Sequence, residues 1–352
     1  MHMADALISP AVGGTMIAAT AGLIGYSSKK LNEEMDDSRI PLMGVMGAFI
    51  FAGQMINFTI PATGSSGHIG GGILLAILLG PYAAFLTIAS VLVVQALFFA
   101  DGGLLALGCN IFNMGFFPCF IVYPLVFKKI MGSSFTKGRL FAATTLSAIL
   151  GLQLGAFCVV LQTLASGVSE LPFATFVLLM QPIHLAIGLV EGLASAAVVL
   201  FIYNMQPEII DGSKVSAGAP SFKKVLVSLV VLAVITGGLF SWFASAFPDG
   251  LEWSMFKTAG VEELEKPKSP IYGILESIQE KTAFLPDYDF KAEPEAGPAA
   301  AEEPAAAAAE EEASWPAVSP GTSVSGILGG AFTLIIALLF GFAVRKRKVV
   351  DS

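Results

Sequence analysis

The feature that most constrains this chain is a series of long apolar segments with very few charged residues. Hydrophobic residues make up 55% of the 352 residues and charged residues 13%, whereas a soluble domain has about 25% charged residues. A helix needs about 20 apolar residues to cross a bilayer. We therefore expect an all-α integral membrane protein with nine passes, near residues 10–27, 40–59, 69–80, 82–100, 104–127, 140–165, 176–203, 224–246 and 325–344.

The uncharged run 69–99 is interrupted by Gly80-Pro81. Proline can end a helix and glycine can turn the chain, so we interpret the run as two passes, with a short or re-entrant first leg as the alternative. Two passes also fit the charges. With the N-terminus outside, every Lys and Arg that does not lie in the one long outer loop then falls on the cytoplasmic side, as the positive-inside rule requires.

The polar stretch 206–223 divides the chain into two predicted units. Residues 1–205 form a seven-pass helical bundle, and residues 224–352 form a two-pass C-terminal unit with a long extracytoplasmic loop. Residues 292–313 of that loop are rich in Ala, Glu and Pro. Such a composition cannot bury a core, so this part is predicted to be a disordered or partly helical spacer.

Histidine is scarce, with three in the whole chain, and one of them follows the initiating residue as Met1-His2. A free α-amine, the His2 backbone nitrogen and the His2 imidazole can close fused five- and six-membered rings around one divalent ion. His68, in the Gly/Ser-rich stretch 64–72, could add a fourth nitrogen. Four nitrogens in a square suit Ni(II) or Cu(II), and Co(II) less sharply.

The two histidines also have plainer interpretations. His2 could be a chance residue in a frayed tail, and His68 could be an exposed loop residue. No basic residue precedes the first apolar stretch, so the N-terminus does not resemble a cleaved signal peptide.

Several polar residues, Ser66 near His68 among them, could support such a site or the path of the ion. Asp5 could orient the His2 ring or balance its charge, and Asp101 lies at the outer end of the fourth pass. Asn110 and Asn113, three apart on one helix face, could hydrogen-bond the N-terminal tail or the His68 loop. The alternative for the two asparagines is ordinary hydrogen bonding between helices.

His184 and Glu191 lie seven residues apart, on one face of the seventh pass. His184 could be a third imidazole, a transient ligand on the path of the ion, or a buried structural partner of Glu191, which is the interpretation we favour. Ser65, Ser66 and His68 would make only a poor catalytic triad, so no enzyme is predicted.

Together these residues resemble the substrate-specific membrane subunits of nickel/cobalt energy-coupling-factor transporters, of the CbiM or NikM type. The resemblance covers about residues 1–205 and rests on Met1-His2 with Asp5, Asn57 to Gly72, Gly80-Pro81, Asp101 to Asn113, and His184 to Gly192. A second motif, just after a pass, resembles the NikN or PDGLE-type auxiliary subunit of the same systems, fused here to the C-terminus. It consists of Pro248, Asp249, Gly250, Leu251 and Glu252.

The resemblance implies that the seven-pass unit captures Ni²⁺ or Co²⁺ as a transported substrate, with Met1, His2 and His68 as its ligands. Nickel is favoured, and cobalt for cobalamin biosynthesis is the alternative. The motif 248–252 would help to load the metal. No permanent cofactor and no nucleic acid partner are expected.

The implied partners are a transmembrane coupling subunit of the CbiQ or NikQ type and ATPase subunits of the CbiO or NikO type. The complex would lie in the plasma membrane of a bacterium or archaeon, surrounded by lipid, with the N-terminus of this chain outside and its C-terminus in the cytoplasm. The sequence contains no Walker A motif, so this chain is not itself the ATPase.

Two other functions remain as alternatives. The chain could be a secondary metal/proton transporter or channel, in which Asp101 and Glu191 would relay protons. A haem-type membrane redox protein, with His68 and His184 as axial ligands, is less favoured because it would leave His2 without a role.

Overall fold

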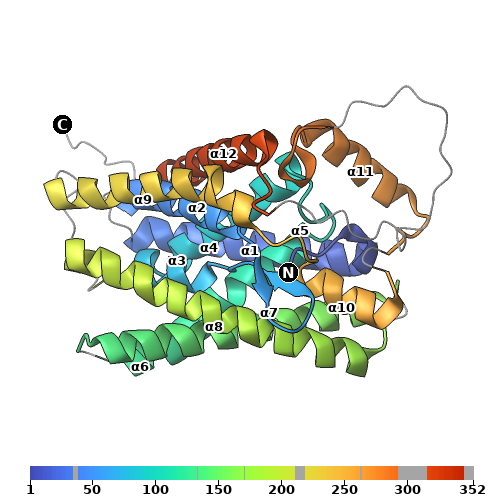
Figure 1. Ribbon diagram of the computed structural model, residues 1–352, viewed down its shortest axis with the longest axis horizontal. Coiled ribbons are helices and arrows are strands. Elements are labelled where there is room, and N and C mark those ends of the chain that lie inside the picture. The colour runs from blue at the N-terminus through green and yellow to red at the C-terminus, as the bar shows by residue number, and fades with distance from the viewer. Residues whose placement is uncertain are drawn as a thin grey trace.

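The computed structural model describes residues 1–34, 39–132, 134–169, 171–210, 219–261, 264–291 and 315–344. Part of the predicted linker, 211–218, and the whole predicted Ala/Glu/Pro-rich spacer, 292–313, lie outside these residues. The described chain is mostly helical, and its long helices run side by side along the long axis of the molecule (Figure 1).

Six helices of the described ranges are long and apolar enough to cross a membrane, which identifies a multi-pass membrane protein. They are α4 (Pro81–Phe98), the continuous helix Leu107–Met131, α7 (Lys137–Ser166), α8 (Phe173–Met205), α9 (Pro220–Gly238) and α12 (Pro320–Val344). The second of these comprises α5 (Leu107–Ile111), a π-helix (Phe112–Phe127) and α6 (Lys128–Met131). Helix α1 (Pro10–Glu34) has 25 residues, a length of about 37 Å.

The predicted second and third passes are shorter in the structure than in the sequence interpretation. Helix α2 (Ile40–Gln54) ends five residues before the predicted position 59. Helix α3 (Gly72–Leu79) has 8 residues, about 12 Å, which is too short to cross a bilayer. The prediction of a full pass at 69–80 is therefore wrong, and the short first leg is what the structure has.

A β-hairpin, which the sequence interpretation missed, replaces the end of the predicted second pass. Strand β1 (Phe58–Ile60) pairs antiparallel with β2 (Ser65–Gly67), so that Phe58 faces Gly67. Ala62 and Gly64 adopt positive φ in the connecting turn. The hairpin carries the chain from the end of α2 to His68, which directly follows β2.

The N-terminal tail lies inside the bundle. Met3, Leu7 and Ile8 are almost completely buried, and residues 5–7 form one 3₁₀ turn before α1. The alternative of a frayed tail is therefore wrong for this structure. Burial of several large apolar side chains favours the folded-in position.

The C-terminal unit packs along the first one. Helices α9 and α12 both contact α2, and Gly329 of α12 approaches so closely that a Cβ there would lie 2.0 Å from the Phe51 ring. The predicted outer loop contains two further helices, α10 (Gly250–Ala259) and α11 (Pro270–Thr282). Helix α10 contacts α8, and α11 contacts α4, so the loop lies over one end of the bundle (Figure 1).

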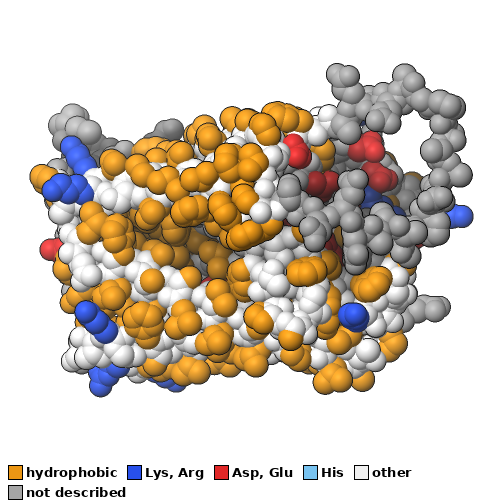
Figure 2. All heavy atoms as spheres, in the orientation of Figure 1, with side chains coloured by type: hydrophobic (Ala, Val, Ile, Leu, Met, Phe, Trp, Pro, Cys, Tyr) orange, Lys and Arg blue, Asp and Glu red, His pale blue; other side chains and the backbone are white. Residues whose placement is uncertain are grey.

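The surface agrees with a membrane position. Hydrophobic side chains cover the middle of the face in Figure 2, and many of its Lys and Arg side chains lie at the left end, where α6 lies in Figure 1. Large apolar residues of α7 and α8 point outward, among them Leu164 and Leu178, which are 55% and 71% exposed. Such a belt is suited to lipid or to a membrane-embedded partner.

Candidate metal site at the N-terminus

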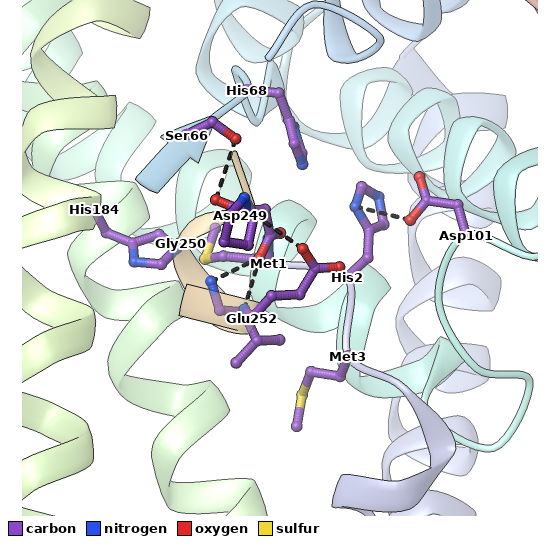
Figure 3. A network of polar contacts seen from close by, with 12 residues as sticks. Met1, His2, Met3, Ser66, His68, Asp101, His184, Asp249, Gly250 and Glu252 are labelled. Atoms are coloured by element: carbon purple, nitrogen blue, oxygen red, sulfur yellow. Dashed lines mark hydrogen bonds and ion pairs between the residues drawn. The ribbon is translucent and has the colours of Figure 1, made fainter. Parts of the chain in front are cut away.

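Met1 lies in a pocket formed where the first unit meets the C-terminal unit (Figure 3). The pocket is lined by Met1, His68, His184 and Asp249, among others. The Met1 ammonium nitrogen is 3.3 Å from Oδ2 of Asp249. The first residue is thus held by a carboxylate from the far part of the chain.

A hydrogen-bond chain fixes the protonation of the His2 ring. Gln54 Nε2 donates to the Gly70 carbonyl (2.9 Å), and Gln95 Nε2 donates to Gln54 Oε1 (2.8 Å). Since a carbonyl can only accept, both amide orientations follow from that anchor. Gln95 Oε1 then faces His2 Nε2 at 3.0 Å and accepts its proton.

The neutral His2 ring therefore keeps its lone pair on Nδ1. That nitrogen is the one that can close a six-membered ring with the His2 backbone nitrogen. In this structure Nδ1 lies 3.4 Å from Oδ1 of Asp101, so a carboxylate faces the predicted ligand.

His68 is arranged in a corresponding way. Its Nδ1 lies 3.0 Å from the carbonyl of Ile69, and this nitrogen must be the donor because the carbonyl only accepts. The lone pair is left on Nε2. The rings of His2 and His68 are stacked, with centroids 5.1 Å apart, and both lie beside Met1 (Figure 3).

Burial favours the neutral form of both rings. Burial lowers the pKa of His2, although Asp101 acts in the opposite direction. Burial, together with the charge of the Met1 ammonium and with the His2 ring, lowers the pKa of His68 to about 4. Neutral imidazole is the form that binds metal ions.

The tail is held by residues that the sequence singled out. Asn110 Oδ1 accepts the Met3 backbone N–H at 2.8 Å, and Asn110 Nδ2 donates to the Met3 carbonyl at 3.2 Å. Asn113 Nδ2 lies 3.7 Å from the Met3 sulfur and donates to Gln162 at 2.8 Å. Asn110 of α5 thereby fixes the backbone next to His2, and Asn113 of the π-helix contacts the Met3 side chain.

Asp5 accepts hydrogen bonds from the backbone of residues 105–106 and does not contact the His2 ring. Its Oδ1 accepts the N–H groups of Leu105 and Ala106, at 2.8 and 3.1 Å. A Cβ on Gly103 would lie 1.8 Å from the same oxygen, so glycine is needed there. Asp101, and not Asp5, faces the His2 ring.

His184 and Glu191 each bind a different backbone group, so the structure does not pair them. His184 Nδ1 donates to the Met180 carbonyl at 2.7 Å. The Glu191 carboxylate accepts the N–H of Gly70 at 2.6 Å and that of Gly71 at 3.1 Å. His184 still lines the pocket around Met1 (Figure 3), whereas Glu191 supports the segment that follows His68.

The motif 248–252 closes the pocket through the hairpin. Ser66 donates its N–H to the Pro248 carbonyl (2.8 Å) and its hydroxyl to the Phe247 carbonyl (2.7 Å). Asp249 is the N-cap of α10: its Oδ1 accepts the N–H groups of Leu251 and Glu252, at 2.7 and 2.9 Å. Its other oxygen remains for Met1.

Electrostatics favour the charged form of Asp249. Burial would raise its pKa, but the adjacent Met1 ammonium and the backbone hydrogen bond within the capping box hold the pKa well below its usual range. Gly250 is required beside it, since a Cβ there would lie 2.6 Å from Ile183 and 3.3 Å from the His184 ring.

Sequence reasoning missed several residues of this network. Gln95 and Gln54 lie within apolar helices and read as ordinary polar residues of a pass. Tyr288 and Tyr272 lie in the segment predicted to be an outer loop. The Tyr288 hydroxyl donates to the Asp101 carboxylate, and the Tyr272 hydroxyl donates to the Ile8 carbonyl at 2.8 Å. An uncharged glutamine inside a predicted pass was the one available signal.

Among the described residues, no group of three or more His, Cys, Asp or Glu side chains is placed to hold a metal. A site built from two imidazoles, an amine and a backbone nitrogen does not require such a group. The donor types present at Met1, His2 and His68 are the nitrogen donors that nickel and copper prefer.

Residues 2–209 match the CbiM family, described as the cobalt uptake substrate-specific transmembrane region, and residues 223–346 match the PDGLE domain. A putative fused nickel transport protein NikMN of Archaeoglobus fulgidus is 30% identical over 346 residues, covering 98% of each chain. The fused nickel transport protein NikMN of Rhodobacter capsulatus is 28% identical, covering 82% of this chain and 88% of its own.

A crystal structure of a truncated transition metal transporter is also similar. It is 28% identical, with a TM-score of 0.52, and the match covers 58% of this chain and 99% of that one. The CbiM match extends over more than half of the chain. This protein therefore belongs to the CbiM family, with a PDGLE domain fused behind the transmembrane region, and is a transport component and not an enzyme.

Proposed function

We propose that this protein is the substrate-capture subunit of an ATP-driven importer of Ni²⁺, with Co²⁺ as the alternative substrate. The observation that carries the proposal is the position of Met1 beside the stacked rings of His2 and His68, at a pocket that Met1 and His68 line (Figure 3). The names of the two fused relatives, which refer to nickel transport, agree with this choice of ion.

The ligand set would consist of the Met1 amine, the backbone nitrogen and Nδ1 of His2, and Nε2 of His68. The amine and the backbone nitrogen would each lose a proton on binding. Oδ2 of Asp249 and Oδ1 of Asp101, which face the amine and the His2 ring, would remain close as counter-charges. Four nitrogens in a plane favour Ni(II) over Co(II).

In the proposed complex, the orientation of this chain in the membrane sets the direction of transport, and the ATPase subunits supply the energy. The pocket would open to the outside and the basic ends of the passes would lie in the cytoplasm, as the positive-inside rule requires. Subunits of the CbiQ or NikQ type and of the CbiO or NikO type would couple ATP hydrolysis to release of the ion.

The test is direct metal binding by the purified full chain with an untagged N-terminus. We expect one Ni²⁺ per chain by titration calorimetry, with an absorption band typical of square-planar nickel. A chain that is folded and monodisperse in detergent but binds neither Ni²⁺ nor Co²⁺ would refute the proposal. Tighter binding of Co²⁺ than of Ni²⁺ would reverse the choice of substrate.

A further inference from the structure

A second cavity lies directly behind the metal pocket and shares its wall. Gly70, Met114 and Leu152 line both spaces. Along α8 the outer pocket is lined by His184 and Ile187, and one turn further the inner cavity is lined by Glu191. The inner cavity is thus displaced from the outer pocket toward the end of α8 at Met205.

Two polar side chains of the inner cavity have oxygen atoms that could still bind a ligand. Glu191 is 2% exposed, and each of its oxygens accepts one backbone hydrogen bond, which leaves one lone pair on each. Ser147 of α7 is completely buried, and its hydroxyl has no hydrogen-bond partner within the described part of the chain. A buried unpaired hydroxyl is unfavourable unless something binds it.

The inner cavity is large enough for one water molecule or one metal ion. Its free space holds about one water-sized sphere. A Cβ on Gly70 would lie 3.3 Å from Oε2 of Glu191 and 3.2 Å from Leu152, so any larger residue there would intrude on the wall shared with the outer pocket. Ionisable groups inside a membrane protein mark paths for ions by default.

We propose that the inner cavity is a second, weaker binding site for the transported divalent cation, with Glu191 and Ser147 as its ligands. The inference rests on the proposed function. Carboxylate and hydroxyl oxygens bind Ni²⁺ or Co²⁺ less tightly than four nitrogens do, so an ion that leaves His2 and His68 would be held here without being trapped. Conduction requires sites that are favourable to enter and weak enough to leave.

Gly70 lies in the wall that separates the two binding sites. Its N–H binds Glu191 and its carbonyl binds Gln54, and it lies two residues after His68. A shift of this short segment would open the outer pocket into the inner cavity. The ion would then move inward past one peptide group.

The test compares binding with transport in the reconstituted complex with its coupling and ATPase subunits. Ser147→Val removes the hydroxyl and fills the cavity but leaves both Glu191 hydrogen bonds intact. Glu191→Gln removes the charge at nearly constant volume, but its NH2 group cannot accept the N–H of Gly70 or Gly71 that it would face, so its effect on affinity is measured separately. Thr144→Val is the matched control, because Thr144 is equally buried on the same helix, bonds its own turn, and does not line the cavity.

We expect Ser147→Val to keep the nickel Kd within about threefold while the initial rate of ⁶³Ni²⁺ uptake falls at least about tenfold; Thr144→Val should change neither. Glu191→Gln should lower the uptake rate by more than any fall in its affinity explains. An unchanged uptake rate in folded Ser147→Val protein would overturn the inference. So would a loss of uptake in Ser147→Val that only follows a loss of affinity, since the inner cavity would then merely support the His68 segment. Failure of the wild type to bind metal would instead refute the proposed function.

Discussion

Oδ2 of Asp249 lies 3.3 Å from the Met1 nitrogen, although 248 residues separate the two in sequence. The same carboxylate caps α10 through its other oxygen. One residue therefore joins the start of the chain to the first turn of a helix in the C-terminal unit. This arrangement gives the fused unit a direct contact with the candidate ligand.

We predict that Asp249→Ser weakens metal capture without unfolding α10. Serine is as good an N-cap as aspartate, but it cannot provide the negative charge beside Met1. Nickel affinity should fall by about tenfold, comparable with the loss of a group adjacent to a metal ligand. Calorimetric titration measures this, and unchanged affinity would show that the contact is only structural.

The control for that variant is Asp249→Ala, which removes both roles. It should lose an additional ~1 kcal/mol of helix stability through the missing cap. A thermal melt in detergent would then place Asp249→Ala below Asp249→Ser, with both at similar nickel affinity.

An N-terminal extension should abolish binding. Two or three residues added before Met1 replace the amine by an amide, which is a far poorer ligand, and they have no room because Met1 is 6% exposed. We expect no measurable nickel binding by the extended protein. The same residues added after Ser352 are the control, and retention of wild-type affinity by the N-terminally extended protein would exclude the amine as a ligand.

Gln95 should act by fixing the form of the His2 ring. Its Oε1 accepts the Nε2 proton and so leaves Nδ1 free to bind the metal. Gln95→Leu should lower nickel affinity by about 10- to 100-fold. Gln95→Glu, which still accepts that proton, should recover much of the loss.

The matched control for Gln95 is Gln153→Leu. Gln153 donates to the Gln181 carbonyl at 2.7 Å, so this variant also removes a helix-to-helix hydrogen bond but does not touch the site. If both variants lose affinity equally, the effect is one of general packing.

The candidate ligands were accessible to sequence reasoning because their chemistry is unusual. Met1-His2 is a chelating pattern in itself, and His68 is one of three histidines in the chain. The partners were not accessible in the same way. Gln95 was not singled out, and Asp249 was singled out only as part of the motif 248–252, without its contact to Met1. Both roles depend on residues more than 90 positions away, and no local pattern records such a distance.

For the fold, too, some elements could be predicted from the sequence and others could not. Long uncharged runs predicted α4, α7 and α8 closely, because a bilayer sets a minimum length for each. The hairpin 58–67 was missed, since its second strand, Ser65–Gly67, carries none of the β-branched or aromatic residues that mark strands. It forms because β2 pairs with β1 and because Ser66 binds the backbone of residues 247–248.

The pH dependence of binding follows from the protons that the metal must displace. The amine and the His2 backbone nitrogen each release one, so affinity should fall as the pH falls, by up to about two decades per unit. His68 should not add to this, because its pKa is lowered to about 4 and it stays neutral above that value. His68 should therefore add no break near 6.5, where an ordinary histidine titrates, to a plot of log affinity against pH between 5 and 8.

Replacing His68 tests the fourth ligand by itself. His68→Ala removes one of four nitrogens and should weaken nickel binding by at least about 100-fold. His184→Ala is the control: it also removes a buried imidazole from the pocket wall, but not a proposed ligand, so its effect on affinity should be much smaller. Loss of the square-planar absorption band in His68→Ala, and its retention in His184→Ala, would separate ligation from packing. The reverse result would place the fourth nitrogen on His184 and would move the ion toward α8.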